Sequence, residues 1–184
     1  MTFEIIIAIL LTGIISNNYA LIEFLGTGAV IENERSSRRS LIVGGGTSLV
    51  MLIATLITWP LNHYLLANVP YLQTLVFVIV VLVVVELVHL ISKRHLEEYC
   101  KVDFLKFAIN GAVLGLCVHN THLDFLPALL TAFSVGLGLT LTMVVFSSLQ
   151  NKIDEEAVPA SFRGLPIALL TAGMMALALL AFVI

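Results

Sequence analysis

Two short stretches place asparagine and glycine within sequence that is otherwise apolar enough to lie in a membrane. Backbone N–H and C=O groups that lack a hydrogen-bond partner cost several kcal/mol each in a bilayer. Residues that interrupt a helix are therefore tolerated at membrane depth mainly where protein or a water-filled cavity surrounds them. We predict that a cavity or cofactor site is lined by the following residues: Asn17, Asn18, Gly26, Thr27, Gly28, Asn110 and Gly111.

The two stretches also share a short pattern, which indicates an internal repeat. Gly28-Ala29-Val30-Ile31 in the first stretch is similar to Gly111-Ala112-Val113-Leu114 in the second. In membrane proteins built from inverted repeats, the two interrupted helices face each other near the middle of the bilayer. We therefore expect the two stretches to meet there.

Glu86 is an ionisable side chain inside an apolar run, and two interpretations of it stay open. A carboxylate within a bilayer is costly, so it is by default a candidate for a proton or cation path. Alternatively, the side chain reaches the membrane interface, or pairs with His89 one turn further on or with a basic residue of the following loop. In the second case Glu86 has no role in ion movement.

Two histidines, His119 and His122, are spaced i, i+3 and have Asp124 nearby, and all three are residue types that bind metals. A solvated turn explains them better, because Asn120 and Thr121 lie between the histidines in a short connection. Haem is also disfavoured, because ligation by two histidines needs a pair at one depth on facing helices, and no such pair is evident. We predict no metal site in this chain.

The composition indicates an integral membrane protein. Of the 184 residues, 59% are hydrophobic and 11% are charged, and the mean hydropathy is +1.06; a soluble domain has about 25% charged residues. The net charge of -3 gives no reason to expect nucleic acid as a partner. The two cysteines, Cys100 and Cys117, lack CxxC spacing, so free thiols are expected. No P-loop, dinucleotide fingerprint, nucleophile elbow or HExxH motif indicates a soluble enzyme.

Six apolar segments of roughly 17–25 residues, the length that crosses a bilayer, follow one another along the chain. They predict an all-α integral membrane protein in one domain, 1–184, with six transmembrane helices in two inverted three-helix repeats at about 1–92 and 101–184. The first and fourth helices are the interrupted ones. The expected bounds are 2–26 with a break after residue 16, 40–59, 71–91, 104–118, 125–149 and 165–184. Gly136 and Gly138 in the fifth helix are spaced for close helix contact.

The distribution of Lys and Arg predicts the orientation. The loops after the first, third and fifth helices carry three, three or four, and two basic residues, and the other connections carry none. Basic loops stay on the cytoplasmic side, so both termini are expected outside. The second half then starts from the opposite side, which requires an inverted repeat. The similarity of residues 46–53 to residues 138–145 supports this pairing of the second helix with the fifth.

Several motifs spread along the chain are specific enough to indicate a family. They are Asn17-Asn18-Tyr19-Ala20-Leu21, Phe24-Leu25-Gly26, Gly111-Ala112-Val113-Leu114-Gly115, Gly136-Leu137-Gly138, Val158-Pro159-Ala160-Ser161-Phe162-Arg163-Gly164 and Ile167-Ala168-Leu169-Leu170-Thr171-Ala172-Gly173. The C-terminal run is the most specific. Together the motifs resemble the membrane subunits of the Rnf and Na⁺-translocating Nqr electron-transport complexes, most closely the RnfA/NqrE type, over essentially the whole chain.

The resemblance implies a metal site, and this chain departs from the family at the ligands. In the family, two homologous subunits of opposite topology pair, and each helix break offers a cysteine, so that four thiolates hold a [2Fe–2S] cluster. Gly28 stands at the cysteine of the family motif Leu-Gly-Leu-Cys-Pro, and Gly111 at that of Asn-Cys-Ala-Val-Leu-Gly. Glycine has no side chain to donate to such a cluster. Cys117, six residues past Gly111, is displaced by about 9 Å along a helix, which is too far to substitute.

The resemblance implies a membrane subunit of an Rnf/Nqr-like electron-transfer complex, without [2Fe–2S] ligands of its own. It would pass or support electron flow across a bacterial or archaeal cytoplasmic membrane, as a non-catalytic or electron-relay subunit. The expected partners are the lipid bilayer, a homologous RnfE- or NqrD-like subunit of opposite topology, and redox subunits that hold any flavin, quinone or [2Fe–2S] cluster. Two alternatives remain open: an ion or small-solute transporter built on inverted repeats, and a scaffold subunit with no redox role.

Overall fold

The computed structural model describes residues 3–16, 18, 19, 21, 25, 37–66, 69–96, 110–154 and 158–181, and every regular element within these ranges is helical. The α-helices are α1 (Phe3–Leu11), α3 (Ser37–Leu61), α4 (Pro70–Leu96), α6 (Gly111–His119), α7 (Phe125–Gln150) and α8 (Leu165–Leu180). The shorter turns are the π-helical η1 (Thr12–Ser16) and η2 (Asn62–Leu66) and the 3-10 turns η3 (Asn120–His122) and η4 (Ala160–Phe162). The predicted all-α class is confirmed for these residues.

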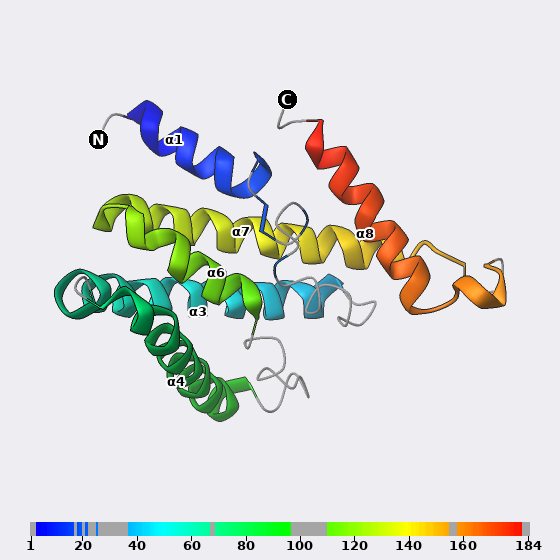
Figure 1. The fold of residues 1–184 in the computed structure, drawn as a ribbon. Helices are drawn as coiled ribbons and strands as arrows, with labels where there is room; N and C mark the ends of the chain where they lie inside the picture. Colours follow the sequence, from blue (N-terminus) through cyan, green and yellow to red (C-terminus); the bar gives the residue numbers. More distant parts are fainter. Residues whose placement is uncertain are drawn as a thin grey trace.

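Three helical segments are long and apolar enough to cross a membrane: Ser37–Leu66, Pro70–Leu90 and Phe125–Gln150. The 26 residues of α7 extend about 39 Å, whereas the hydrocarbon core of a bilayer is about 30 Å thick. Two further apolar helices, Glu4–Ile14 and Leu165–Leu180, are shorter. Both of them pack against α7 (Figure 1).

The centre of the fold is the antiparallel pair of α3 and α7, which lie side by side (Figure 1). Near one end, the hydroxyl groups of Ser37 on α3 and Ser148 on α7 are hydrogen-bonded at 3.1 Å. At the other end, Trp59 Nε1 donates to the carbonyl oxygen of Leu123, 2.8 Å away, just before α7 begins. These two contacts fix the direction and the register of the pair.

Small residues let the backbones of α3 and α7 approach closely. A Cβ atom on Gly44 would lie 2.8 Å from the Cα atom of Thr140, and one on Gly136 would lie 2.8 Å from Ser48 Cβ. Between these glycines, the hydroxyl oxygens of Ser48 and Thr140 are hydrogen-bonded at 3.0 Å. Close packing and hydrogen bonds drive helix association in membranes, because lipid removes the hydrophobic driving force. The close contact predicted at Gly136 is confirmed.

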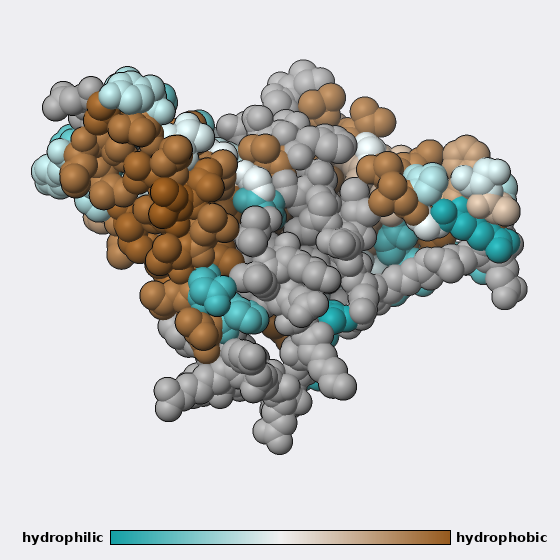
Figure 2. All heavy atoms as spheres, turned by 60° about the horizontal axis from the view of Figure 1, so that its bottom comes forward, coloured by the Kyte–Doolittle hydropathy of each residue, from teal (hydrophilic) through white to brown (hydrophobic). Residues whose placement is uncertain are grey.

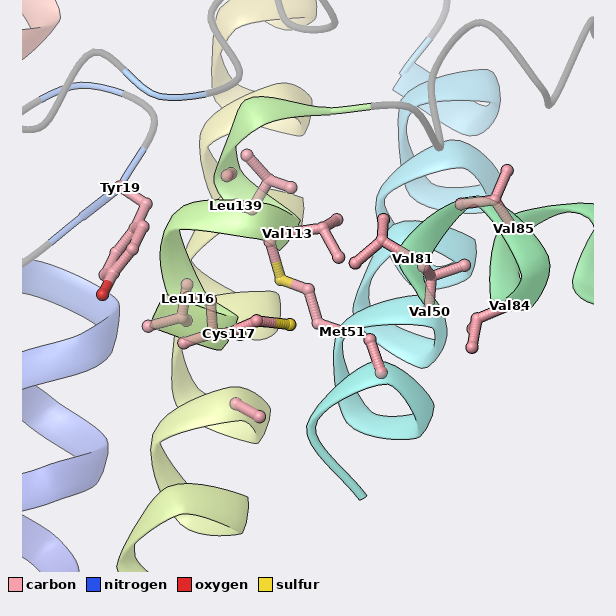
Figure 3. Close-up of a cluster of buried hydrophobic side chains, with 14 of the residues drawn as sticks. Tyr19, Val50, Met51, Val81, Val84, Val85, Val113, Leu116, Cys117 and Leu139 are labelled. Carbon is pink, nitrogen blue, oxygen red and sulfur yellow. The ribbon is translucent and has the colours of Figure 1, made fainter. Parts of the chain in front are cut away.

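Each of the other helices packs against α3 or α7. α1 and η1 pack on α7, α6 packs on α3, α4 packs on α3 and α6, and α8 packs on α7. The contact of η1 with α7 depends on Gly138, where a Cβ atom would lie 2.8 Å from the carbonyl oxygen of Gly13. Apolar side chains such as Met51, Phe77 and Phe146 are fully buried between the helices. Figure 3 shows one such cluster, which joins α3, α4, α6 and α7.

The outer face of α4 is apolar along most of the helix, and it forms much of the brown surface in Figure 2. Its exposed apolar side chains are Leu72, Leu75, Val78, Ile79, Leu82, Val83, Leu87 and Leu90. Contiguous apolar surface of this extent marks contact with a membrane or with another protein. The face therefore suits lipid tails or a neighbouring transmembrane helix.

Two helices continue past their expected ends. α3 passes through Pro60 and ends at Leu61, directly before the π-helical η2. Membrane helices tolerate proline where local π-helical turns or neighbouring groups satisfy the freed backbone. α4 continues to Leu96, since the segment after its expected end at residue 91 contains neither glycine nor proline. α6 is described from Gly111 onward, and the expected start of this helix at residue 104 lies outside the described residues.

We predict that alanine at position 138 lowers the stability of the fold, because the added methyl group pushes η1 away from α7. An extra methyl group forced into a close-packed contact costs about 1–3 kcal/mol. Gly173 on α8 is the matched control, because its Cβ would meet no neighbouring atom within 4 Å. Thermal unfolding in detergent should show a lower midpoint for Gly138→Ala and an unchanged or higher midpoint for Gly173→Ala, because alanine is the better helix former. Equal midpoints would contradict this packing.

Candidate functional site at the two helix breaks

The first break follows η1 and is held by the side chain of Asn18, which is only 1% exposed. Asn18 Nδ2 donates to Thr142 Oγ1 at 2.8 Å and to the carbonyl oxygen of Gly138 at 3.3 Å, both on α7. Asn18 Oδ1 accepts a hydrogen bond from the backbone N–H of Leu21 at 3.3 Å. The amide thus replaces hydrogen bonds that an uninterrupted helix would supply, and it attaches the break to α7.

The second break is the start of α6, where Asn110 has an extended backbone with φ -117° and ψ 130°. Asn110 Oδ1 accepts a hydrogen bond from the backbone N–H of Ala112 at 3.1 Å, which caps the helix. The backbone carbonyl oxygen of Asn110 accepts one from the N–H of Val113 at 3.0 Å. Asn110 Nδ2 is buried, and no acceptor reaches it among the residues that the structure describes.

The described parts of the two breaks are in contact. Leu25 lies over Gly115, where a Cβ atom would be 2.6 Å from Leu25 Cδ1 and 3.9 Å from Tyr19 Cε1. A Cβ atom on Gly111 would be 4.0 Å from Leu25 Cδ2. The ring of Tyr19 also meets the ring of His119 edge-on, with centroids 6.4 Å apart. Glycine on this face of α6 therefore makes room for side chains of the first break.

Three of the residues predicted to line a cavity lie in this region. Asn18 precedes Tyr19 in the chain and binds α7, and Asn110 precedes Gly111, which Leu25 approaches. The other predicted residues lie outside the described residues: Asn17, Gly26, Thr27 and Gly28. That all of them line one cavity stays a prediction.

Glu86 is not among these contacts. It has an exposed side chain on the outer face of α4, next to the exposed side chains of Val83, Leu87 and Leu90. His89, one turn further on, has a buried Nδ1 atom without a hydrogen-bond partner in the described ranges. Both interpretations of Glu86, the ion path and the interfacial carboxylate, stay predictions.

The connection between α6 and α7 contains the histidines considered above as metal ligands. His119, His122 and Asp124 all have exposed side chains. Within the described ranges, no three His, Cys, Asp or Glu side chains come together as they would around a metal ion. His119 contacts Tyr19 instead, so this histidine packs against the first break.

The groups described at the breaks do not fit an iron–sulfur cluster, which takes four thiolates or a mixture of thiolates and imidazoles. Gly111 offers no side chain. Cys117 is a free thiol, 1% exposed, as the sequence predicts. It points toward Met51 on α3, whereas Tyr19 lies on the opposite side of α6 (Figure 3). The breaks instead offer amide groups, backbone N–H groups and hydrocarbon.

The residues that hold the breaks in place were only partly predictable. Thr142 and Gly138 accept hydrogen bonds from Asn18, and together with Ser134 they recur every four residues on a buried stripe of α7. Residues four apart share a helix face, so small and polar residues at this spacing indicate a face that needs a polar partner. Leu25 gives no such signal, because an apolar side chain in an apolar segment has no distinguishing pattern.

We predict that cysteines at positions 25 and 115 form a disulfide, because Leu25 Cγ lies 3.9 Å from the position of a Cβ atom on Gly115. The atom bonded to Cβ at position 25 is Cγ in leucine and sulfur in cysteine, so the sulfur of a cysteine there would lie near the Cβ atom of a cysteine at position 115, as an S–S bond of about 2.0 Å requires. The variant Leu25→Cys, Gly115→Cys is made in a chain that also carries Cys100→Ser and Cys117→Ser. The control pairs Leu25→Cys with Gly173→Cys on α8. Peptide mass spectrometry after mild oxidation should find the cross-link only in the first; equal yields would show that the breaks do not meet.

Comparison with known proteins identifies the family. Residues 6–184 match the family described as Rnf-Nqr subunit, membrane protein. The chain is 34% identical over 184 residues to a protein of Syntrophotalea carbinolica that is named as a subunit of an ion-translocating oxidoreductase complex, covering 96% of this chain and 95% of that protein. It is 33% identical over 176 residues to the protein of the same name in Sodalis glossinidius, covering 92% and 91%. These matches and the three membrane-capable helices show that the chain is membrane-embedded and belongs to the Rnf-Nqr subunit family.

Proposed function

We propose that this chain is a membrane subunit of an ion-translocating oxidoreductase complex. There it passes or supports electron flow across the membrane without supplying ligands to a [2Fe–2S] cluster. The family and the names of the relatives, which describe a subunit of such a complex, support the first part. The observation that carries the second part is the break at α6, where Gly111 has no side chain and Leu25 packs alongside. The chain is a non-catalytic or electron-relay subunit within this proposal.

Two inverted three-helix repeats are part of the proposal, and the packing at the centre of the fold supports them. Ser48 and Thr140, which are hydrogen-bonded between α3 and α7, are 92 residues apart in the sequence. The same spacing relates Gly44 to Gly136, and the contacts of these glycines are reciprocal: Gly44 meets Thr140, and Gly136 meets Ser48. Reciprocal contacts of this kind are expected around a two-fold axis.

The surrounding helices follow the same relation. α1 packs on α7 as α6 packs on α3, and α4 packs on α3 as α8 packs on α7. The spacing of 92 also relates Asn18 to Asn110, and both side chains accept a hydrogen bond from a nearby backbone N–H through Oδ1. In the proposed arrangement six helices cross the membrane, and the interrupted first and fourth helices face each other.

The distribution of charge supports a cytoplasmic position for the end where α3 begins and α7 ends. Arg38, Arg39 and Lys152 lie at that end, where serine hydroxyl groups join the two helices. The described segments at the opposite end, 53–66 and 118–128, contain no Lys or Arg. Basic residues stay on the cytoplasmic side, so both termini lie outside in this proposal.

The proposed partners are a homologous RnfE- or NqrD-like subunit of opposite topology and the redox subunits that hold flavin, quinone or iron–sulfur groups. The apolar face of α4 and a second one on α8 support neighbours within the membrane. On α8 the exposed apolar side chains are Leu165, Leu169, Leu170, Met174, Leu177 and Leu180. Transmembrane partners pack through faces of this kind.

We predict that this chain supplies no iron ligand to its complex. The complex, purified from its native membrane through a tag on this chain, should contain redox subunits and show flavin or iron–sulfur absorbance. Replacing both thiols, Cys100→Ser and Cys117→Ser, should leave its iron content and the EPR signals of its reduced clusters unchanged. Loss of one cluster signal in the double variant would contradict the proposed absence of ligands.

The same purification distinguishes the proposal from a transport function. A chain that purifies alone and colourless, and that moves an ion or small solute across liposome membranes, would refute a role in a redox complex.

A further inference from the structure

The outer face of α4, which is apolar surface in Figure 2, carries one acidic side chain, that of Glu86. The apolar span of this helix runs from Pro70 to Leu90, and Glu86 is the only Asp, Glu, Lys or Arg within it. The 21 residues of the span extend about 30 Å, which is the thickness of the hydrocarbon core of a bilayer. Glu86 therefore lies about 6 Å inside the nearer end of the span.

Helix geometry favours a position of the Glu86 carboxylate that is deeper in the membrane still. In an α-helix the side chains point back toward the N-terminus of the helix. Glu86 is near the C-terminal end of the span, so its side chain points toward the middle of the bilayer and away from the nearer surface. Lys and Arg reach the interface through long stems, whereas glutamate has only two methylene groups. The carboxylate therefore belongs in apolar surroundings.

The described residues of the chain do not neutralise Glu86. Among them, its exposed carboxylate has no hydrogen bond and no ion pair. His89, one turn further on, has a buried Nδ1 atom that also lacks a hydrogen-bond partner there. Ionisable residues inside a membrane almost always face protein or a water-filled cavity, and they pair with one another. A group of opposite charge from outside the described residues is therefore expected beside Glu86.

The equivalent helix of the other half carries no such carboxylate. In the proposed repeat, the spacing of 92 residues relates Glu86 to Ala178 on α8, which is also exposed. The whole of Leu165–Leu180 contains no charged residue. The outer faces of α4 and α8 thus differ by one charge. Lipid tails offer a carboxylate no partner, so the difference identifies the face of α4 as a contact with protein.

We propose that the outer face of α4 packs against a transmembrane helix of a different subunit, and that this helix carries a Lys or Arg that pairs with Glu86. The inference deepens the proposed function and rests on it, because it requires a complex with other membrane subunits. A second copy of this chain does not fit. A two-fold contact would place the same surface on both sides, so that Glu86 would face Glu86, and Pro70–Leu90 contains no Lys or Arg to separate them.

The first test identifies what lies on α4, and it uses the complex purified through a tag on this chain. The photoreactive residue p-benzoylphenylalanine replaces Val83, which is exposed one turn before Glu86. Irradiation should join position 83 to an apolar segment of a different subunit that contains Lys or Arg. Cross-links to lipid alone, to a second copy, to another segment of this chain, or to a segment without Lys or Arg would overturn the proposal.

The second test removes the charge. Glu86→Gln and Glu86→Leu should each raise the rate at which the cross-linked subunit leaves the complex in detergent about tenfold or more, the effect expected for a lost hydrogen bond between charged groups. The control is Glu4→Leu, which removes an exposed carboxylate in the first turn of α1 and should leave the rate unchanged. A face in contact with lipid would suit leucine well. Unchanged rates for both Glu86 variants, or an equal rise for Glu4→Leu, would overturn the proposal.

A charge exchange completes the test. Glu86→Lys should abolish association with the cross-linked subunit, and changing the Lys or Arg of that subunit to Glu should restore it in the same complex. Failure of this exchange to restore association would overturn the pairing. Failure of the chain to purify with any redox subunit would instead refute the proposed function, because that result is recorded before irradiation.

Discussion

Backbone hydrogen-bonding groups at membrane depth have no water to bind, so every interruption of a helix needs a substitute partner. Asn18 supplies one at the first break by binding α7, and Asn110 supplies one at the second by capping α6. The breaks are positioned by the close contact of α3 with α7, because η1 rests on α7 and α6 rests on α3. The small residues at that contact, Gly44 and Gly136 among them, therefore determine where the breaks can meet.

The two helix breaks contact each other through an apolar side chain, that of Leu25, which packs against Gly115. The resemblance implies thiolates and iron at this place in the family, whereas the described residues of this chain bring hydrocarbon against backbone. Full burial of a leucine side chain contributes about 1.5–3 kcal/mol. Under the proposed function, the redox groups then belong to the partner subunits, and this chain positions them within the membrane.

Much of the fold was predictable, because a helix that crosses a bilayer needs about 20 apolar residues. Asn110 and Gly111 indicated an interruption of the fourth helix, and α6 begins at this interruption with Asn110 as its cap. The sequence alone did not show that Thr142 accepts a hydrogen bond from Asn18, because a pairing across 124 residues depends on how η1 packs on α7. It also did not place Leu25 against α6, because apolar contacts have no direction. Because of Pro60 we expected α3 to end at residue 59, but the helix continues to Leu61. Proline is tolerated in membrane helices where neighbouring groups compensate for its missing N–H.

The position of iron relative to this chain decides between the two ways of joining the breaks. Anomalous diffraction at the iron absorption edge, from crystals of the complex, locates iron independently of the protein density. We expect Leu25 packed against Gly115 and every iron peak bonded to side chains of partner subunits only. An iron peak bonded to Cys100, to Cys117 or to any other side chain of this chain would show that the breaks are joined by metal after all.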